Sequence, residues 1–148
     1  MTRQSIFTIG YEGKNVDDFI NRLKRYNITT LIDVREIPSS RKPGFSKGRL
    51  SENLKSANIS YIHMKELGSP RELREKLHED NDYSSFFEGY GKYLDTQLGS
   101  VKYLHDEVLS NGVSCIMCME RDPLHCHRKI VAEKIKEVNG NGLTITHI

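Results

Sequence analysis

The sequence predicts an α/β fold: a three-layer, Rossmann-like, mostly parallel five-stranded sheet, with helices on both faces and a helical insertion between strands three and four. Short apolar runs alternate with amphipathic helical patterns along the chain, which is typical of parallel sheets. The apolar run at 113–119 is nearly unbroken and indicates a strand buried on both faces. With 148 residues, 36% of them hydrophobic, the chain has the size expected of a single α/β domain spanning 1–148.

Three strands are predicted in the first half of the chain, at residues 6–10, 31–34 and 59–64. Each is a short apolar run that ends near a polar residue or a glycine. A helix follows the first strand, because Asn15 is a typical N-cap, acidic residues occupy the first turn and basic residues come late. A second helix is indicated by apolar residues at helical spacing: Leu50, Leu54 and Ala57.

The predicted insertion lies between the third strand and the run at 113–119. It begins at residues 69–72, Ser-Pro-Arg-Glu, which form a capping box with Pro at the first helical position. Aromatic residues at helical spacing follow, and this favours a buried helix face over base stacking: Tyr83, Phe86, Phe87, Tyr90 and Tyr93. A further helix carries Leu98, Val101, Leu104 and Val108. The last helix carries an apolar stripe of Ile130, Val131, Ile135 and Val138, and a final strand at 143–146 follows it.

Composition excludes several classes of protein. A net charge of +2 is too small to indicate nucleic-acid binding by bulk charge. No apolar run approaches the ~20 residues that cross a bilayer, so no membrane partner is expected. The three cysteines, Cys115, Cys118 and Cys126, are odd in number and crowded together, and no apolar leader precedes the first strand. We therefore expect a cytoplasmic protein with reduced thiols.

Polar residues gather at the predicted strand ends, where open parallel sheets bind their ligands. A turn of Gly10, Tyr11 and Glu12 follows the first strand. Asp33 interrupts the second strand, where an unpaired carboxylate would be costly to bury. It is either a functional carboxylate or half of a structural ion pair, with a partner expected among Arg35, Arg121 and Arg128.

The segment 118–128 has the highest density of potentially reactive and charged side chains in the sequence. Cys118 and Glu120 end the fourth strand, and Asp122 with Pro123 is predicted to start the last helix. Residues 126–128, Cys-His-Arg, would then lie at a helix N-terminus, an environment that lowers the pKa of a thiol and binds anions.

Several interpretations of these thiols stay open. Cys118 or Cys126 is a nucleophile assisted by His127 or His125, or the two thiols form a redox pair. Alternatively, Cys118, Cys126 and His127 hold a divalent metal such as zinc. The structural alternative is that the thiols fill the core, which is the interpretation favoured for Cys115. We expect that the protein needs no cofactor, and the divalent metal is the alternative to this expectation.

The segment 35–49 is a predicted loop with five basic residues and one acidic residue. Such a loop can wrap a phosphate or a nucleic-acid backbone. A solvated basic turn explains the same composition.

Three motifs resemble the domain-of-unknown-function 488 family. They are residues 8–13 (Thr-Ile-Gly-Tyr-Glu-Gly), Asp33-Val34-Arg35 with Pro38 and Ser40, and the set Cys118, Glu120, Cys126, His127 and Arg128. The resemblance implies a small three-layer α/β protein from a family without a settled activity. The motif residues that this resemblance assigns to the present chain are Gly10, Asp33, Arg35, Cys118, Glu120, Cys126, His127 and Arg128. The family often has His-Ser where this chain has Tyr11-Glu12, and Cys115 falls outside its pattern.

We therefore expect an enzyme that acts on an anionic substrate, phosphate-bearing, nucleotide or nucleic acid, by hydrolysis or group transfer. The expected catalytic residues are Asp33, Cys118, Glu120, Cys126 and His127. The expected anion-binding residues are Arg35, Arg41, Lys42, Arg121 and Arg128. The alternatives are a nucleic-acid-binding module that uses the 35–49 loop, and a metal protein that uses Cys118, Cys126 and His127.

Overall fold

The computed structural model describes residues 4–110 and 112–148, and within them the chain forms one five-stranded sheet in which all neighbouring strands are parallel. The strand order is β3-β2-β4-β1-β5. The strands are β1 (Ser5–Gly10), β2 (Thr30–Asp33), β3 (Ser60–His63), β4 (Ser114–Cys118) and β5 (Thr144–His147). The expectation that no apolar leader precedes the first strand concerns residues 1–3 in part, and these residues lie outside the described residues.

Helices connect these strands in the predicted alternation. They are α1 (Val16–Arg25), α2 (Lys47–Ser56), α3 (Arg71–Asp80), α4 (Tyr83–Asp95), α5 (Leu98–Ser110) and α6 (Arg128–Val138), with short 3-10 turns η1 (Lys65–Leu67) and η2 (Pro123–His125). The predicted α/β class and the helical insertion between the third and fourth strands are therefore confirmed, and α3, α4 and α5 make up the insertion.

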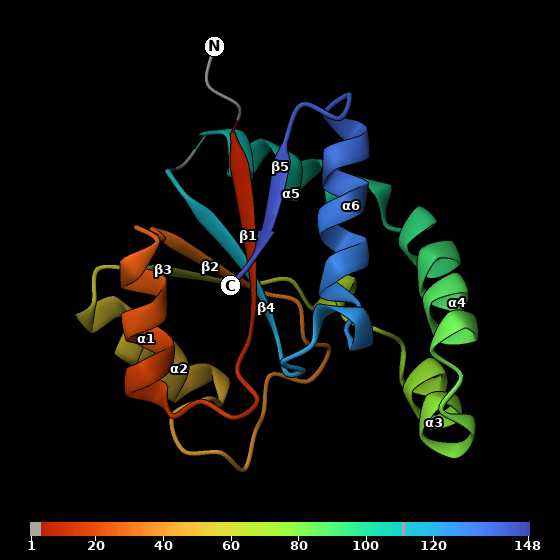
Figure 1. Ribbon diagram of the computed structural model, residues 1–148, viewed down its shortest axis with the longest axis horizontal. Coiled ribbons are helices and arrows are strands. Elements are labelled where there is room, and N and C mark those ends of the chain that lie inside the picture. The colour runs from red at the N-terminus through yellow and green to blue at the C-terminus, as the bar shows by residue number, and fades with distance from the viewer. Residues whose placement is uncertain (1–3, 111) are drawn as a thin grey trace.

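The sheet is covered on both faces, which gives the three predicted layers. Figure 1 shows α1 and α2 on one side of the sheet and α6, with α4 beyond it, on the other. Side chains alternate along β4, so Cys115 and Met117 enter the core under α1 and α2. Ile116 and Cys118 enter the opposite core, under α5 and α6. This alternation confirms Cys115 as a fully buried core residue.

Two predicted helix starts were wrong. Ser69 caps no helix through its side chain: α3 begins at Arg71, and Pro70 in the cap position carries no side-chain hydrogen bond. Asp122 and Pro123 start only the short turn η2, whose Leu124 amide donates to the Asp122 carboxylate. The long helix α6 begins at Arg128 with His127 as its N-cap, so residues 126–128 do lie at its N-terminus, and Cys126 lies one residue before the cap.

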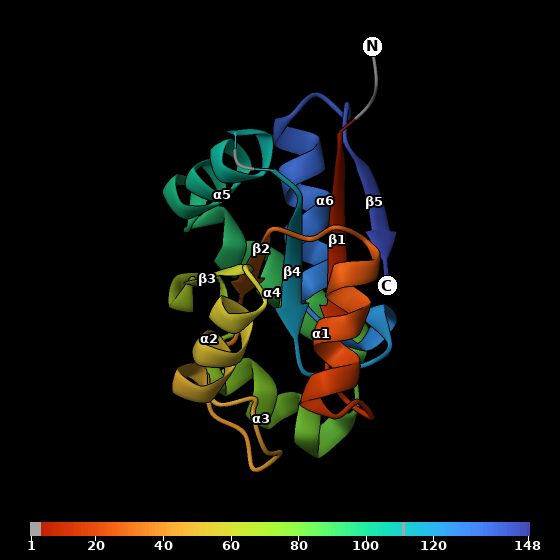
Figure 2. The same ribbon diagram turned by 90° about the vertical axis from the view of Figure 1, so that its left-hand side faces the viewer.

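The topology creates a crevice at the C-terminal edge of β4. The chain leaves β4 toward α6 on one face, whereas it leaves the flanking strands β1 and β2 toward α1 and α2 on the other. Such a reversal opens a gap between loops, where doubly wound proteins bind ligands. In Figure 2, β1 and β4 run toward the end of the molecule where α3 lies.

Two histidines on charged helices differ in their exposure. His78 is exposed, whereas His105 is half-buried and contacts Asp106 and Asn139. Among residues 4–110 and 112–148, no helix has both the length and the apolar character needed to cross a membrane.

Candidate active site

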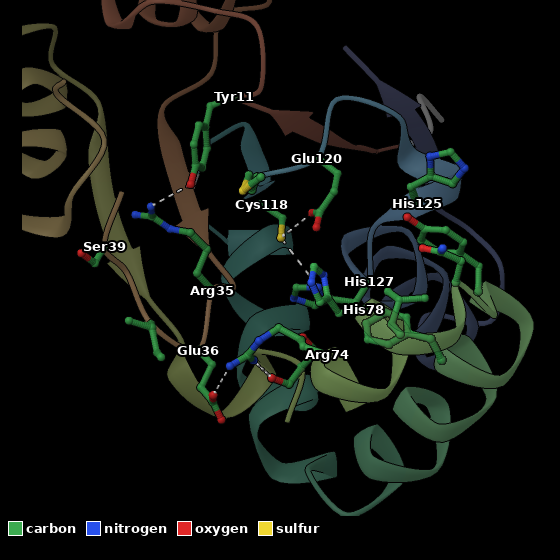
Figure 3. A pocket seen from close by; sticks show the side chains of 17 residues that line it. Tyr11, Arg35, Glu36, Ser39, Arg74, His78, Cys118, Glu120, His125 and His127 are labelled. Atoms are coloured by element: carbon green, nitrogen blue, oxygen red, sulfur yellow. Dashed lines mark hydrogen bonds and ion pairs between the residues drawn. The ribbon is translucent and has the colours of Figure 1, made fainter. Parts of the chain in front are cut away.

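A pocket of about 380 Å³ lies at the C-terminal ends of β1, β2 and β4. Figure 3 shows its side chains, which come from two sources. The strand ends and the loops that follow them contribute Tyr11, Arg35, Cys118 and Glu120, and the N-cap of α6 contributes His127. The helical insertion contributes the opposite wall, with Arg74, His78, Tyr83 and Phe86. The pocket thus combines residues that are more than a hundred positions apart in the sequence.

Asp33 and Arg35 form the ion pair that the sequence left as an alternative. Arg35 Nε donates to Asp33 Oδ1 at 2.9 Å, and Arg35 Nη2 donates to Oδ2 at 2.7 Å. The Tyr61 hydroxyl also donates to Oδ2, at 2.5 Å. Asp33 is fully buried, and its carboxylate is occupied by these donors. It therefore acts on the pocket through Arg35, which it orients.

Arg35 presents the remaining edge of its guanidinium to the pocket. Its Nη1 lies 3.5 Å from the Tyr11 hydroxyl, and its guanidinium carbon lies 5.4 Å from the centre of the Tyr11 ring. Tyr11 is itself stacked on Phe45 at 4.7 Å between ring centres. His63 fixes the Arg35 backbone, because its Nε2 contacts the Arg35 carbonyl oxygen at 2.8 Å. A fixed arginine at a pocket wall suits the binding of a carboxylate or a phosphate.

Cys118 lies between two groups that can take its proton. Its Sγ is 3.7 Å from His127 Nδ1 and 3.5 Å from Glu120 Oε2 (Figure 3). Cys118 is the last residue of β4 and lines the pocket, although only a small part of it is exposed. A thiol within reach of an imidazole is the arrangement of an activated nucleophile.

The tautomer of His127 is set by the backbone. Its Nε2 lies 2.8 Å from the carbonyl oxygen of Val34, which can only accept a hydrogen bond. The proton of the neutral ring is therefore on Nε2, and Nδ1 faces Cys118 as an acceptor. The loop after β2 thus orients the base that serves the thiol at the end of β4.

Several groups around His127 favour its protonated form, the imidazolium. Burial lowers the pKa of His127, but Cys126, the hydrogen bond to Val34 and the Glu120 carboxylate favour the imidazolium, and the net shift is upward. Cys126 is the largest of these favourable contributions, and it falls away while Cys126 is a thiol; Val34 and Glu120 then remain as the partners that favour the charge. His127 can therefore hold a proton taken from Cys118.

Cys126 is not the activated thiol that a helix N-terminus predicted. It is almost fully buried, and burial, together with its neighbour Cys118, raises its pKa well above the ordinary value. Cys126 lies directly before His127, the N-cap of α6, but burial outweighs the lowering of the thiol pKa expected from the helix N-terminus. Cys115 is inert for a similar reason, since burial also raises its pKa.

Three potential metal ligands meet at the buried side of the pocket. The ligand atoms of Cys118, Cys126 and His127 all lie within 4.8 Å of one another. Two thiols and an imidazole are ligands that zinc prefers. This set matches the divalent-metal alternative drawn from the sequence.

The predicted anion-binding residues separate into different places. Only Arg35 lines the pocket; Arg41 is exposed and lies outside its lining. Lys42 Nζ donates to the carbonyl oxygens of Tyr11 and Lys14, and so braces the loop after β1. Arg121 and Arg128 line a second hollow on the other side of that loop.

The loop after β1 packs tightly against the exit of β4, and this contact divides the two hollows. The Glu12 amide donates to the Met119 carbonyl oxygen at 2.9 Å. A Cβ atom on Gly10 would lie 1.7 Å from the carbonyl oxygen of Glu120. Gly10 is therefore needed for close backbone approach. Of the predicted turn, Tyr11 faces the pocket and Glu12 faces the second hollow.

Sequence reasoning missed the wall contributed by the insertion. Arg74 forms an ion pair with Glu36 at 2.7 Å, and both line the pocket (Figure 3). Tyr83 stacks on His125 at 4.5 Å between ring centres. His78, an exposed residue of α3, also lines the pocket. No local pattern distinguishes these residues from ordinary helix-surface residues, because their position depends on how α3 and α4 fold back.

The comparisons place the chain in a family. Residues 15–135 match the family described as Domain of unknown function DUF488. The match covers most of the chain, including both thiols of the site and the Asp33–Arg35 pair, and the protein belongs to this family. No match was found among the curated proteins or among the solved structures.

Proposed function

We propose that this protein is an enzyme that uses Cys118 as a nucleophile on an anionic substrate, in a hydrolysis or group-transfer reaction. The observation that supports it best is the Cys118–His127 contact of 3.7 Å, with the tautomer of His127 fixed by Val34. Arg35 supplies a positive charge on the wall of the same pocket, oriented by its buried partner Asp33.

The proposed reaction needs no group beyond these side chains and water. His127 Nδ1 takes the proton of Cys118, and the thiolate attacks an electrophilic carbon or phosphorus atom of the substrate. A bond to sulfur forms while the leaving group departs with the proton from His127. Water, or a second acceptor, then gives a proton to His127 and displaces the sulfur, which recovers its own proton. Glu120 favours the imidazolium between these steps.

Site-resolved alkylation with iodoacetamide at neutral pH tests the nucleophile. We expect Cys118 to react faster than Cys126 and Cys115 in the folded protein. His127→Gln should slow the Cys118 reaction at least about tenfold, because a positioned base contributes about 10²–10⁴-fold. His105→Gln, which changes a half-buried histidine bound to Asn139, is the matched control and should leave the rate unchanged.

The proposal fails if Cys118 reacts no faster than Cys126 in the folded protein. It also fails if His127→Gln leaves the rate unchanged while its circular dichroism shows a folded chain. Should His127→Gln not fold, Glu120→Gln provides the second variant. Loss of the Glu120 charge should lower the pH at which the histidine-dependent labelling sets in, since the imidazolium is then less favoured.

A divalent-metal site is the second candidate, and the meeting of Cys118, Cys126 and His127 within 4.8 Å supports it. Metal analysis of protein prepared without chelator separates the two. One zinc ion per chain that is lost in Cys126→Ser would favour the metal site, and alkylation of Cys118 would then require zinc removal. The nucleophile proposal instead expects Cys126→Ser to keep rapid labelling of Cys118.

A further inference from the structure

A second hollow, of about 480 Å³, lies on the opposite side of the loop after β1 from the thiol pocket. Its cationic side chains come from four different segments. Lys14 belongs to the loop after β1, Arg22 to α1, Arg121 to the loop after β4, and Arg128 to the start of α6. His147 of β5 completes the lining, and Glu12 is its acidic member.

The positive charges of this hollow lack ion-pair partners among residues 4–110 and 112–148. Arg128 is 1% exposed, and its guanidinium donates only to neutral oxygens: Thr8 Oγ1 and the carbonyls of Glu120 and Arg121. Arg22 Nε is buried without a hydrogen-bond partner in the described part of the chain. Holding a buried cation without a counter-charge is costly, so a bound anion would stabilise this region.

The cations are close enough to influence one another. Burial lowers the pKa of Lys14, and Arg22, Arg121, Arg128 and Lys42 lower it further. The acidic Glu12 is partly used elsewhere, since its Oε1 accepts from the Arg121 backbone amide at 3.1 Å. Four basic side chains thus converge with a single acidic side chain, Glu12, and this arrangement favours an anion at the hollow.

His147 adds an uncharged polar group. Burial, together with Arg128 and Lys129, lowers the pKa of His147, so its ring is neutral at neutral pH. The Thr8 hydroxyl, which accepts from Arg128 Nε, contacts His147 Nδ1 and can donate to it. The ring proton is then on Nε2, which gives this hollow a neutral donor beside its cations.

We propose that this hollow binds the phosphate or pyrophosphate group of a small molecule, separately from the thiol pocket. Arginine guanidinium groups match phosphate oxygens in geometry and charge. The backbones of the loop after β1 and the exit of β4 separate the two hollows, with Gly10 against Glu120 at the closest point. The second site therefore stands independently of the proposed nucleophile.

Calorimetric titration with pyrophosphate at low salt tests the site. We expect one pyrophosphate per chain, and we expect Arg22→Gln and Arg121→Gln each to weaken binding at least about tenfold, the effect of losing one hydrogen bond to a charged group. Arg49→Gln is the matched control, because Arg49 is an exposed arginine on α2 outside both hollows. It should change the affinity less than about twofold. Urea unfolding checks that each variant is folded.

Two outcomes would overturn the site: no pyrophosphate binding by the folded wild type, or equal weakening by Arg22→Gln, Arg121→Gln and Arg49→Gln. Binding of an oligonucleotide but not of pyrophosphate would also overturn it, in favour of a nucleic-acid surface. Pyrophosphate should leave the alkylation rate of Cys118 unchanged; protection would place the anion in the thiol pocket instead. If Cys118 is unreactive but pyrophosphate still binds through Arg22 and Arg121, only the proposed enzyme function fails.

Discussion

Replacing Asp33 by Asn tests whether the buried ion pair holds Arg35 in place. The substitution keeps the shape of the side chain and removes its charge, which leaves the Arg35 guanidinium 6% exposed and without its counter-ion. Breaking a buried pair from one side costs about 3–5 kcal/mol. Because Asp33 also accepts from Tyr61 and from the Arg35 amide, the isosteric Asn cannot satisfy all of these donors.

Urea unfolding gives the free energy of unfolding for wild type and variants. We expect Asp33→Asn to lower it by about 3–5 kcal/mol, which corresponds to a Tm lower by roughly 6–20 °C for a domain of this size. Glu52→Gln, an exposed acid on α2, is the control and should stay within about 0.5 kcal/mol of wild type. The reasoning is refuted if Asp33→Asn costs no more than Glu52→Gln.

Further predictions concern the packing and the pH response. Gly10→Ala should destabilise the fold by about 1–3 kcal/mol or more in the same urea assay, because its Cβ would meet the Glu120 carbonyl at 1.7 Å. Gly48→Ala, whose Cβ meets nothing within 4 Å, should instead be neutral or gain up to about 1 kcal/mol; equal losses would contradict the close approach. The pKa of His147 is lowered by burial, so the unfolded chain binds its proton more readily and stability is lost as pH falls below about 6.5. His147→Gln should flatten this part of the stability–pH profile, and an unchanged slope would argue against the neutral ring.

Periodicity and strand-end polarity predicted much of this architecture. The alternation of apolar runs and helices predicts the parallel sheet, and the nearly unbroken apolar run at 113–119 predicts that β4 is buried on both faces. The polar strand ends led to Arg35, Cys118, Glu120 and His127, which do share one pocket. These signals are local or follow from the direction of parallel strands. They can therefore be recognised in the sequence without knowledge of the tertiary packing.

Other features depend on packing that no local pattern encodes. Asp122 and Pro123 start the short turn η2 and not the last helix. The lowered thiol pKa expected at Cys126 does not arise, because this side chain is buried beside Cys118. Arg121 and Arg128 follow the same strand as Cys118, yet the contact at Gly10 places them in a separate hollow. The contributions of Arg74 and His78 depend on the path of the insertion, which folds back over the strand ends.

The most direct test of the account compares iodoacetate with iodoacetamide at Cys118, using glutathione in the same solution as the reference thiol. The two reagents differ chiefly in charge, so their rate ratio reports the local field at the sulfur. Because Arg35 lines the same pocket as Cys118, we predict a higher iodoacetate-to-iodoacetamide ratio at Cys118 than at glutathione, and a lower one in Asp33→Asn, where Arg35 loses its support. A Cys118 ratio at or below that of glutathione in folded wild-type protein would contradict an anionic substrate in this pocket.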